Sequence, residues 1–220
     1  MLRDIDMSQV SDGRLYSSRD MVKAGCDDCK GCSACCRGMG SSIVLDPYDI
    51  YMLTAGLEQS FEQLLGYAIE LNLVDGIILP NLKMQGEKEA CPFLNEEERC
   101  SIHRFRPGFC RMFPLGRIYG EGGFSYFLQV HECKKQPKTK VKINKWLGIP
   151  NLKVYEAYIN QWHTFLKGVE KILKSFQEQA SVKNSTMYLL KTFFLEPYQR
   201  DRDFYPQFEE RMKKAEVYFF

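Results

Sequence analysis

Apolar residues recur at helical spacing through the last third of the chain. They follow one another every three or four positions, as one face of an α-helix of about six turns does. We interpret this stripe as a core or helix-pair contact, with a cofactor face as the alternative. The stripe consists of Tyr155, Tyr158, Trp162, Phe165, Val169, Ile172 and Phe176. The pattern predicts two shorter helices after it, near residues 185–196 and 204–219.

The middle of the chain carries two helix-start signals. Asp46 is a good N-cap, and Pro47 suits the first helical position. Ser60 and Gln63 have the spacing of a capping box, in which each side chain accepts a hydrogen bond from the other residue's backbone. We therefore expect one helix to begin at Asp46 and a second to run from Ser60 to about Leu71.

Short strands are expected between these helical regions. A turn at residues 75–76 precedes an apolar run at 77–79, and a second strand is expected around 82–84. Another turn at residues 122–123 leads into alternating residues at 124–130. The fold class is therefore α+β and mainly helical, with short β-strands and a helical C-terminal segment.

Changes in composition divide the chain into three parts. Residues 1–24 form an irregular lead-in, residues 25–135 a cysteine-bearing domain, and residues 146–220 a helical segment packed on it. Between the last two, residues 134–145 carry six lysines and no acidic residue. We interpret this run as a solvated connector rather than a nucleic-acid patch, because no aromatic residues interleave to stack on bases.

Five cysteines fall within the stretch GCDDCKGCSACC, residues 25–36. A gap of two residues between cysteines allows a tight turn to bring both sulfurs to one metal, with backbone N–H groups directed at the thiolates. Three overlapping pairs of this kind are a strong metal signal. The stretch supplies Cys26, Cys29, Cys32, Cys35 and Cys36.

The last two of these cysteines are adjacent. Neighbouring side chains point in different directions in extended or turn conformations, so Cys35 and Cys36 are expected to serve two metal centres or two irons of one cluster. The alternative is a vicinal disulfide, which needs strained geometry and oxidising conditions.

A second cysteine segment, CPFLNEEERCSIHRFRPGFCRMFPL, covers residues 91–115. Eight thiols match either two four-thiolate sites or one cluster with four thiols left over. Cys26 is then the spare, and His103 is either an alternative ligand or a hydrogen-bonded turn residue. The eight expected metal ligands are Cys29, Cys32, Cys35, Cys36, Cys91, Cys100, Cys110 and Cys133.

Arginines flank the cysteines and can offset thiolate charge while donating hydrogen bonds to sulfur. We expect this supporting role for Arg106 and Arg111, which lie between cysteines, and a solvated turn for Arg99. A binding site for a substrate anion would give the same pattern. The remaining flanking arginines are Arg37 and Arg104.

Composition and charge narrow the function classes. Hydrophobic residues make up 45% of the 220-residue chain, enough for a core without disulfides, and the nine cysteines are an odd number. The N-terminus lacks the apolar stretch of a signal peptide, and no run approaches the about 20 residues of a membrane span. We therefore expect a cytoplasmic protein with reduced thiols. A net charge of +2 gives no reason to expect nucleic acid or a membrane as a partner.

The motifs CKGCSACC, CPFL and CSIHRFRPGFCRMFP resemble those of the YkgJ-type cysteine-cluster family, described as zinc- or iron-chelating CxxCxxCC domains. The resemblance covers roughly residues 25–135, and the stretch IVLDPYDIYML is similar to the family's helix between the two segments. It implies metal or iron–sulfur binding. One relative, flagellin lysine N-methylase, links the motif to methyl transfer, but this chain has no convincing nucleoside-binding glycine loop.

Three hypotheses follow. The preferred one is an iron–sulfur protein with a redox or enzyme-associated role and an unknown protein or redox partner. The vicinal pair and the surplus thiols favour it. The second is a zinc-binding structural or interaction module, and the third is a methyltransferase-like enzyme that binds S-adenosylmethionine. The sequence leaves open whether the protein is an enzyme.

Overall fold

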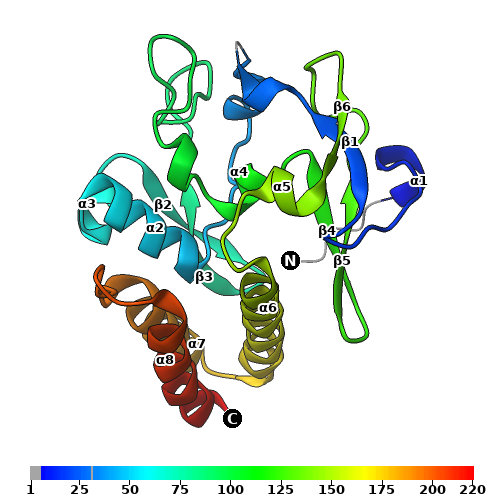
Figure 1. The fold of residues 1–220 in the computed structure, drawn as a ribbon. Helices are drawn as coiled ribbons and strands as arrows, with labels where there is room; N and C mark the ends of the chain where they lie inside the picture. Colours follow the sequence, from blue (N-terminus) through cyan, green and yellow to red (C-terminus); the bar gives the residue numbers. More distant parts are fainter. Residues whose placement is uncertain (1–5, 31) are drawn as a thin grey trace.

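A computed structural model describes residues 6–30 and 32–220 (Figure 1). Residues 1–5 of the expected lead-in and Gly31 of the cysteine stretch lie outside the described residues. The fold is α+β and mainly helical, as the sequence predicts. The C-terminal helices lie together at the bottom of Figure 1, and the loops of residues 26–42 and 84–101 lie at the top.

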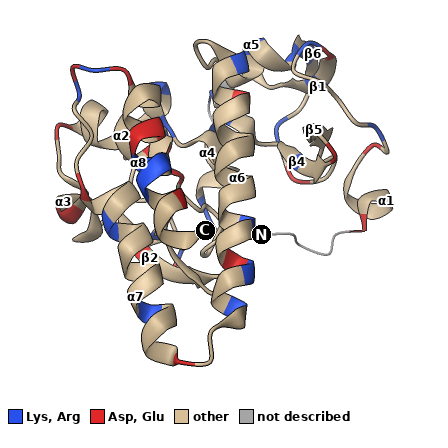
Figure 2. Ribbon diagram, turned by 90° about the horizontal axis from the view of Figure 1, so that it is seen from below, with Lys and Arg blue, Asp and Glu red and all other residues tan. Residues whose placement is uncertain are grey.

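The C-terminal segment is helical as predicted. Helix α6 spans Leu152–Ser175 and buries the predicted stripe from Tyr155 to Val169, whereas Ile172 is half-buried and Phe176 is the exposed residue that follows the helix. Helix α7, Gln179–Leu190, begins earlier than expected and continues into a π-helical turn at Lys191–Leu195, while α8 spans Phe204–Phe219. Figure 2 shows basic and acidic positions interspersed over these helices. The stripe is therefore a core contact: Trp162 packs edge-on against Phe193 at 4.8 Å between ring centroids.

Both helix-start signals are confirmed. Helix α2, Pro47–Leu57, begins after the N-cap Asp46, and helix α3, Phe61–Leu65, begins after Ser60. Each helix has a complete capping box, with Asp49 and Gln63 as the reciprocal partners. Helix α2 packs against the C-terminal helices through Tyr48, whose ring meets Tyr155 of α6 and Phe204 of α8 edge-on.

The second helix is much shorter than predicted. It ends at Leu65, and Ile69–Val74 forms strand β2, which pairs antiparallel with β3, Ile77–Leu82, across the predicted turn at 75–76. The expected helix to Leu71 is wrong because residues 69–74 pair with β3, and after the buried Ile69 they alternate between half-buried and exposed positions. The two strands expected at 77–79 and 82–84 are one strand that ends at Leu82.

The strand expected at 124–130 is present as β5, Gly123–Leu128. Its partner β4, Leu115–Gly120, was not expected, and the two form an antiparallel hairpin that begins directly after the second cysteine segment. Helix α4, Gly108–Met112, lies immediately before it and carries Cys110.

The lead-in and the lysine-rich run are more ordered than predicted. The lead-in contains helix α1, Met7–Val10, and strand β1, Met21–Gly25. Strand β1 pairs antiparallel with β6, Thr139–Lys142, which lies inside the lysine-rich run and precedes α5, Ile143–Leu147. The lysines remain mostly exposed, as expected of a solvated connector, but the backbone of the run completes a two-stranded sheet. Long-range pairing of this kind has no local signal, so the sequence did not reveal it.

Among the described residues, no helix is both long enough and apolar enough to cross a bilayer.

Candidate metal centre

The first cysteine segment folds as a succession of tight turns directly after β1. Backbone N–H groups donate to carbonyl oxygens three residues earlier, from Cys32 to Cys29 at 3.0 Å and from Cys36 to Ser33 at 2.9 Å. Two short 3₁₀ helices, η1 at Asp27–Cys29 and η2 at Ala34–Cys36, belong to this path. The spacing of two residues between cysteines thus produces the turns that it predicts.

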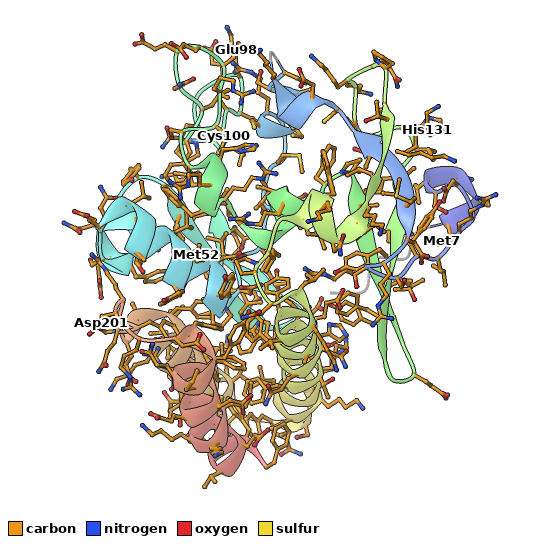
Figure 3. The ribbon with its side chains drawn as sticks, viewed as in Figure 1. Met7, Met52, Glu98, Cys100, His131 and Asp201 are labelled. Atoms are coloured by element: carbon orange, nitrogen blue, oxygen red, sulfur yellow. The ribbon has the colours of Figure 1, made fainter. Side chains whose placement is uncertain are left out.

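The second segment closes on the first through the backbone. The Cys91 N–H donates to the Cys36 carbonyl at 2.8 Å, and the Gly38 N–H donates to the Glu89 carbonyl at 3.0 Å. At the tip of the second segment, Glu98 accepts a hydrogen bond from Ser33 at 2.8 Å. Cys100 lies on the inner side of this tip (Figure 3). Two stretches far apart in the sequence are therefore held side by side.

Cys110 reaches the site from α4, which is anchored to the neighbouring helices. The buried Asp49 carboxylate on α2 accepts a 2.7 Å hydrogen bond from the Gly108 N–H. A Cβ at position 108 would collide with the Tyr155 hydroxyl, so only glycine allows α4 to approach α6 this closely. The position of Cys110 thus depends on contacts outside the cysteine segments.

Seven cysteines line one cavity of about 60 Å³, several times the about 10–15 Å³ that one water requires. Much of the remaining lining is apolar and includes Met39, Ile43, Phe109 and Phe113. Of the eight expected ligands, Cys133 lies outside this lining, as does the expected spare, Cys26. The seven cavity cysteines are Cys29, Cys32, Cys35, Cys36, Cys91, Cys100 and Cys110.

Backbone N–H groups face three of the sulfurs in the same way. The sulfurs of Cys91, Cys100 and Cys133 each accept a hydrogen bond from the backbone of the residue two positions further along the chain. Such bonds favour the thiolate, the form that binds a metal. The sequence predicted such N–H groups for the two-residue turns of the first segment, and these three cysteines lie outside those turns.

The adjacent cysteines do not diverge as the sequence argument expected. The thiols of Cys35 and Cys36 form a hydrogen bond, which is the largest cause of the raised pKa of Cys35. Both residues belong to the 3₁₀ helix η2 and line the cavity, a placement that agrees with two irons of one cluster. All nine cysteines are free thiols.

The arginines near the cysteines do not all have the positions expected from the sequence. Arg106 lines the cavity, and its charge lowers the pKa of Cys29, Cys35 and Cys100 against the larger effects that raise it. Arg99, expected in a solvated turn, also lines the cavity, and its charge lowers the pKa of Cys100 against the larger effect of burial.

Arg111 does not line the cavity. Its Nε donates to the Arg106 carbonyl at 3.0 Å, and its Nη2 donates to the Arg104 carbonyl. Arg111 therefore supports the loop that carries Arg106 rather than meeting the thiols. His103 lines the cavity, and its Nε2 is hydrogen-bonded to the Arg106 guanidinium, which matches the role of a hydrogen-bonded turn residue.

Burial raises the pKa of the cavity thiols in the metal-free protein. It is the largest cause for Cys29, whose pKa rises to about 12, and for Cys91, whose pKa rises to about 11. Burial also raises the pKa of Cys110 well above its usual range. These thiols are protonated at neutral pH, so binding a metal must remove their protons.

We therefore expect metal binding to release protons and to weaken as the pH falls. Isothermal titration calorimetry in two buffers of different ionisation enthalpy measures the release, expected at about one proton per thiol ligand. Metal binding without proton release would contradict thiol ligation.

The donor set fits a thiophilic metal or a cluster. It combines clustered thiols, backbone donors to sulfur and a compensating cation with largely apolar walls. Among the described side chains, no group of three or more possible ligands lies close enough together to hold an ion already. The thiols must therefore close on the metal when it binds.

Residues 28–146, just over half of the chain, match the family model CxxCxxCC, described as "Putative zinc- or iron-chelating domain". No curated protein and no solved structure matches the chain.

Proposed function

The chain belongs to the CxxCxxCC family of zinc- or iron-chelating domains, and from this premise we propose that it holds an iron–sulfur cluster in its cysteine-lined cavity. One observation carries the proposal: more thiols surround this cavity than one tetrahedral ion can use. A cluster needs four thiolates and also room for its inorganic sulfides, and the cavity offers both. When bound, such a cluster supplies one-electron transfer.

The protein's own residues would set the environment of the cluster. Arg106 offsets thiolate charge, and the rings of Phe109 and Phe113 exclude water from the cavity. Hydrogen bonds to sulfur and solvent exclusion are among the features by which a protein adjusts a cluster's reduction potential. These features support a redox role with a protein electron-transfer partner in a reducing compartment, for which we propose the cytoplasm.

Metal analysis and an absorption spectrum of protein purified without oxygen test the proposal. We expect iron and acid-labile sulfide in equal amounts, and a brown protein with broad absorbance near about 400 nm. The raised pKa values of the free thiols make iron loading at neutral pH dependent on proton release, so reconstitution should be carried out above pH 7. A colourless protein that carries only zinc would overturn the cluster proposal and favour the zinc-binding module.

A further inference from the structure

Cys26 is the most buried of the nine cysteines, with 4% of its surface exposed, yet it does not line the cavity. A buried cysteine on its own is usually an inert apolar residue. Cys26 is not on its own, because its sulfur lies 3.8 Å from the sulfur of Cys29. With metal–sulfur bonds of about 2.3 Å, two sulfurs of a tetrahedral site lie about 3.8 Å apart. The pair thus has the separation of two ligands of one ion, although a hydrogen bond between thiols also permits this distance.

The backbone around this pair is held in an unfavourable conformation. Asp27 and Cys29 both lie in the left-handed region, with φ of 53° and 59°. Residues other than glycine adopt this region at a cost in free energy, and such residues cluster at functional sites. The kinks at Asp27 and Cys29 fold the chain back so that the sulfurs of Cys26 and Cys29 meet.

The β1–β6 sheet brings a third cysteine to the same place. Gly25, next to Cys26, pairs with Thr139, and a Cβ at position 25 would collide with the threonine hydroxyl. The loop that leads into β6 carries Cys133, and this loop is tied to the first cysteine segment by a 2.7 Å hydrogen bond from Lys135 Nζ to the Lys30 carbonyl. Cys133 is therefore held beside the start of the cysteine loop, away from the cavity.

Electrostatic interactions place the thiols in two overlapping neighbourhoods. Cys133 interacts with Cys26 and Cys32, and it has a nearby cation of its own in Lys138. Cys29 is common to both neighbourhoods, because it interacts with Cys26 and also with Cys35 and Arg106. The other neighbourhood is centred on the cavity and has Arg99 and Arg106 as cations. In it, Cys110 interacts with Cys35, Cys91 and Cys100.

We propose that Cys26, Cys29, Cys32 and Cys133 form a second four-thiolate site that binds a single Zn²⁺ ion beside the cluster cavity. The proposal rests on the proposed function, in that thiolates of this chain bind metal. A single ion lies between its sulfur ligands and needs no cavity. This fits a site in which two of the four thiols, those of Cys26 and Cys133, lie outside the cavity lining. Five cavity thiols then remain for the cluster, one more than it requires.

This site changes the assignment of the spare cysteine. The sequence alone made Cys26 dispensable, and the family match begins only at residue 28. In the proposed site, Cys26 is the ligand that ties β1 to the cysteine loop, and Cys133 connects the loop before β6 to the same ion. The zinc site thus fastens both strands of the β1–β6 sheet to the metal centre.

Zinc content of the full chain, purified without oxygen and supplied with ZnSO₄, tests the site. We expect Cys26→Ser and Cys133→Ser each to lose the same zinc, with binding weaker by at least about 10–100-fold, because even residues behind a metal ligand contribute that much. The double variant should lose no more zinc than either single variant. Cys91→Ser should instead lose iron and keep zinc. Lys30→Ala, an exposed change in the same loop that keeps the Lys30 carbonyl, should keep both metals.

Alkylation of the unaltered protein tests the same site without a variant that could fail to fold. Zinc should protect Cys26 and Cys133 from iodoacetamide together, over the same range of zinc concentration. Full zinc retention in Cys26→Ser, or protection of Cys133 without Cys26, would overturn the second site and leave the cluster proposal standing. A wild-type protein that binds neither iron nor zinc would instead overturn the proposed function.

Discussion

Removing the metal is expected to unfold the two cysteine-bearing loops and leave the rest of the fold in place. These loops, residues 26–42 and 84–101, bury very little apolar surface. Among the described side chains of the first loop, Cys26 and Ser33 are buried, and in the second loop Phe93 is buried. Without metal, such segments cannot offset the conformational entropy that they lose on ordering. A structural zinc site contributes about 10–16 kcal/mol of apparent binding free energy, enough to hold them.

Hydrogen exchange before and after treatment with a chelator under reducing conditions measures this effect. Peptides from both loops should lose their protection, whereas peptides from α6 and α8 should keep it, because these helices bury their own apolar faces. The β2–β3 hairpin is a matched internal control, since it lies between the two loops in the sequence but has five buried residues in β3 alone. Unchanged protection in both loops would show that metal does not hold them.

The sequence correctly predicted the features that depend on only a few neighbouring residues. Asp46 and Ser60 begin helices because a cap depends only on the next three residues. The end of the second helix was missed because residues 69–74 are held as a strand by their pairing with β3, not by their own preference. Strand β1 was missed for the same reason, since its partner β6 lies far along the chain in a lysine-rich run.

The candidate site shows the same difference between local signals and long-range contacts. Spacing correctly indicated that the thiols of the two segments gather, and seven of them line one cavity. Spacing gave no information on which thiols are neighbours, because that depends on the β1–β6 sheet and on the position of α4. Cys26 therefore looked dispensable, although its sulfur lies 3.8 Å from the sulfur of Cys29, and Arg99 looked solvated, although it lines the cavity.

Replacing Asp49 by alanine is expected to destabilise the protein by about 2–4 kcal/mol and to weaken metal binding through Cys110. The Asp49 carboxylate accepts hydrogen bonds from the Asp46 N–H at 3.1 Å and from the Gly108 N–H at 2.7 Å. The first bond is half of a capping box, and loss of a cap costs about 0.5–2 kcal/mol. Loss of the second bond leaves the buried Gly108 N–H without its acceptor, which costs about 1–3 kcal/mol. Gly108 begins the helix that carries Cys110.

The chain contains a matched control for the capping contribution. Gln63 occupies the corresponding position of the exposed capping box on α3, where its side chain accepts from the Ser60 N–H at 2.8 Å. Gln63→Ala removes the same half of a cap without touching α4. Urea denaturation of the metal-free variants should give a larger loss of stability for Asp49→Ala than for Gln63→Ala, and the difference measures the bond to Gly108.

Asp49→Asn distinguishes the hydrogen bond from the charge. Burial is the largest cause that raises the pKa of Asp49 well above its usual range, and the neighbouring Asp46 raises it further. The ionised carboxylate is therefore costly to bury, and its raised pKa means that stability declines as the pH rises from about 4 through the pKa in the folded protein. Asparagine keeps an oxygen acceptor for the Gly108 N–H but places its NH2 group where the second oxygen accepts from the Asp46 N–H. This variant should therefore lose the capping bond, keep the bond to Gly108 and lose that pH dependence, so it should be more stable than Asp49→Ala. If Asp49→Asn is as unstable as Asp49→Ala, the carboxylate charge rather than the bond to Gly108 holds α4, and the Cys110 thiol is positioned by electrostatics.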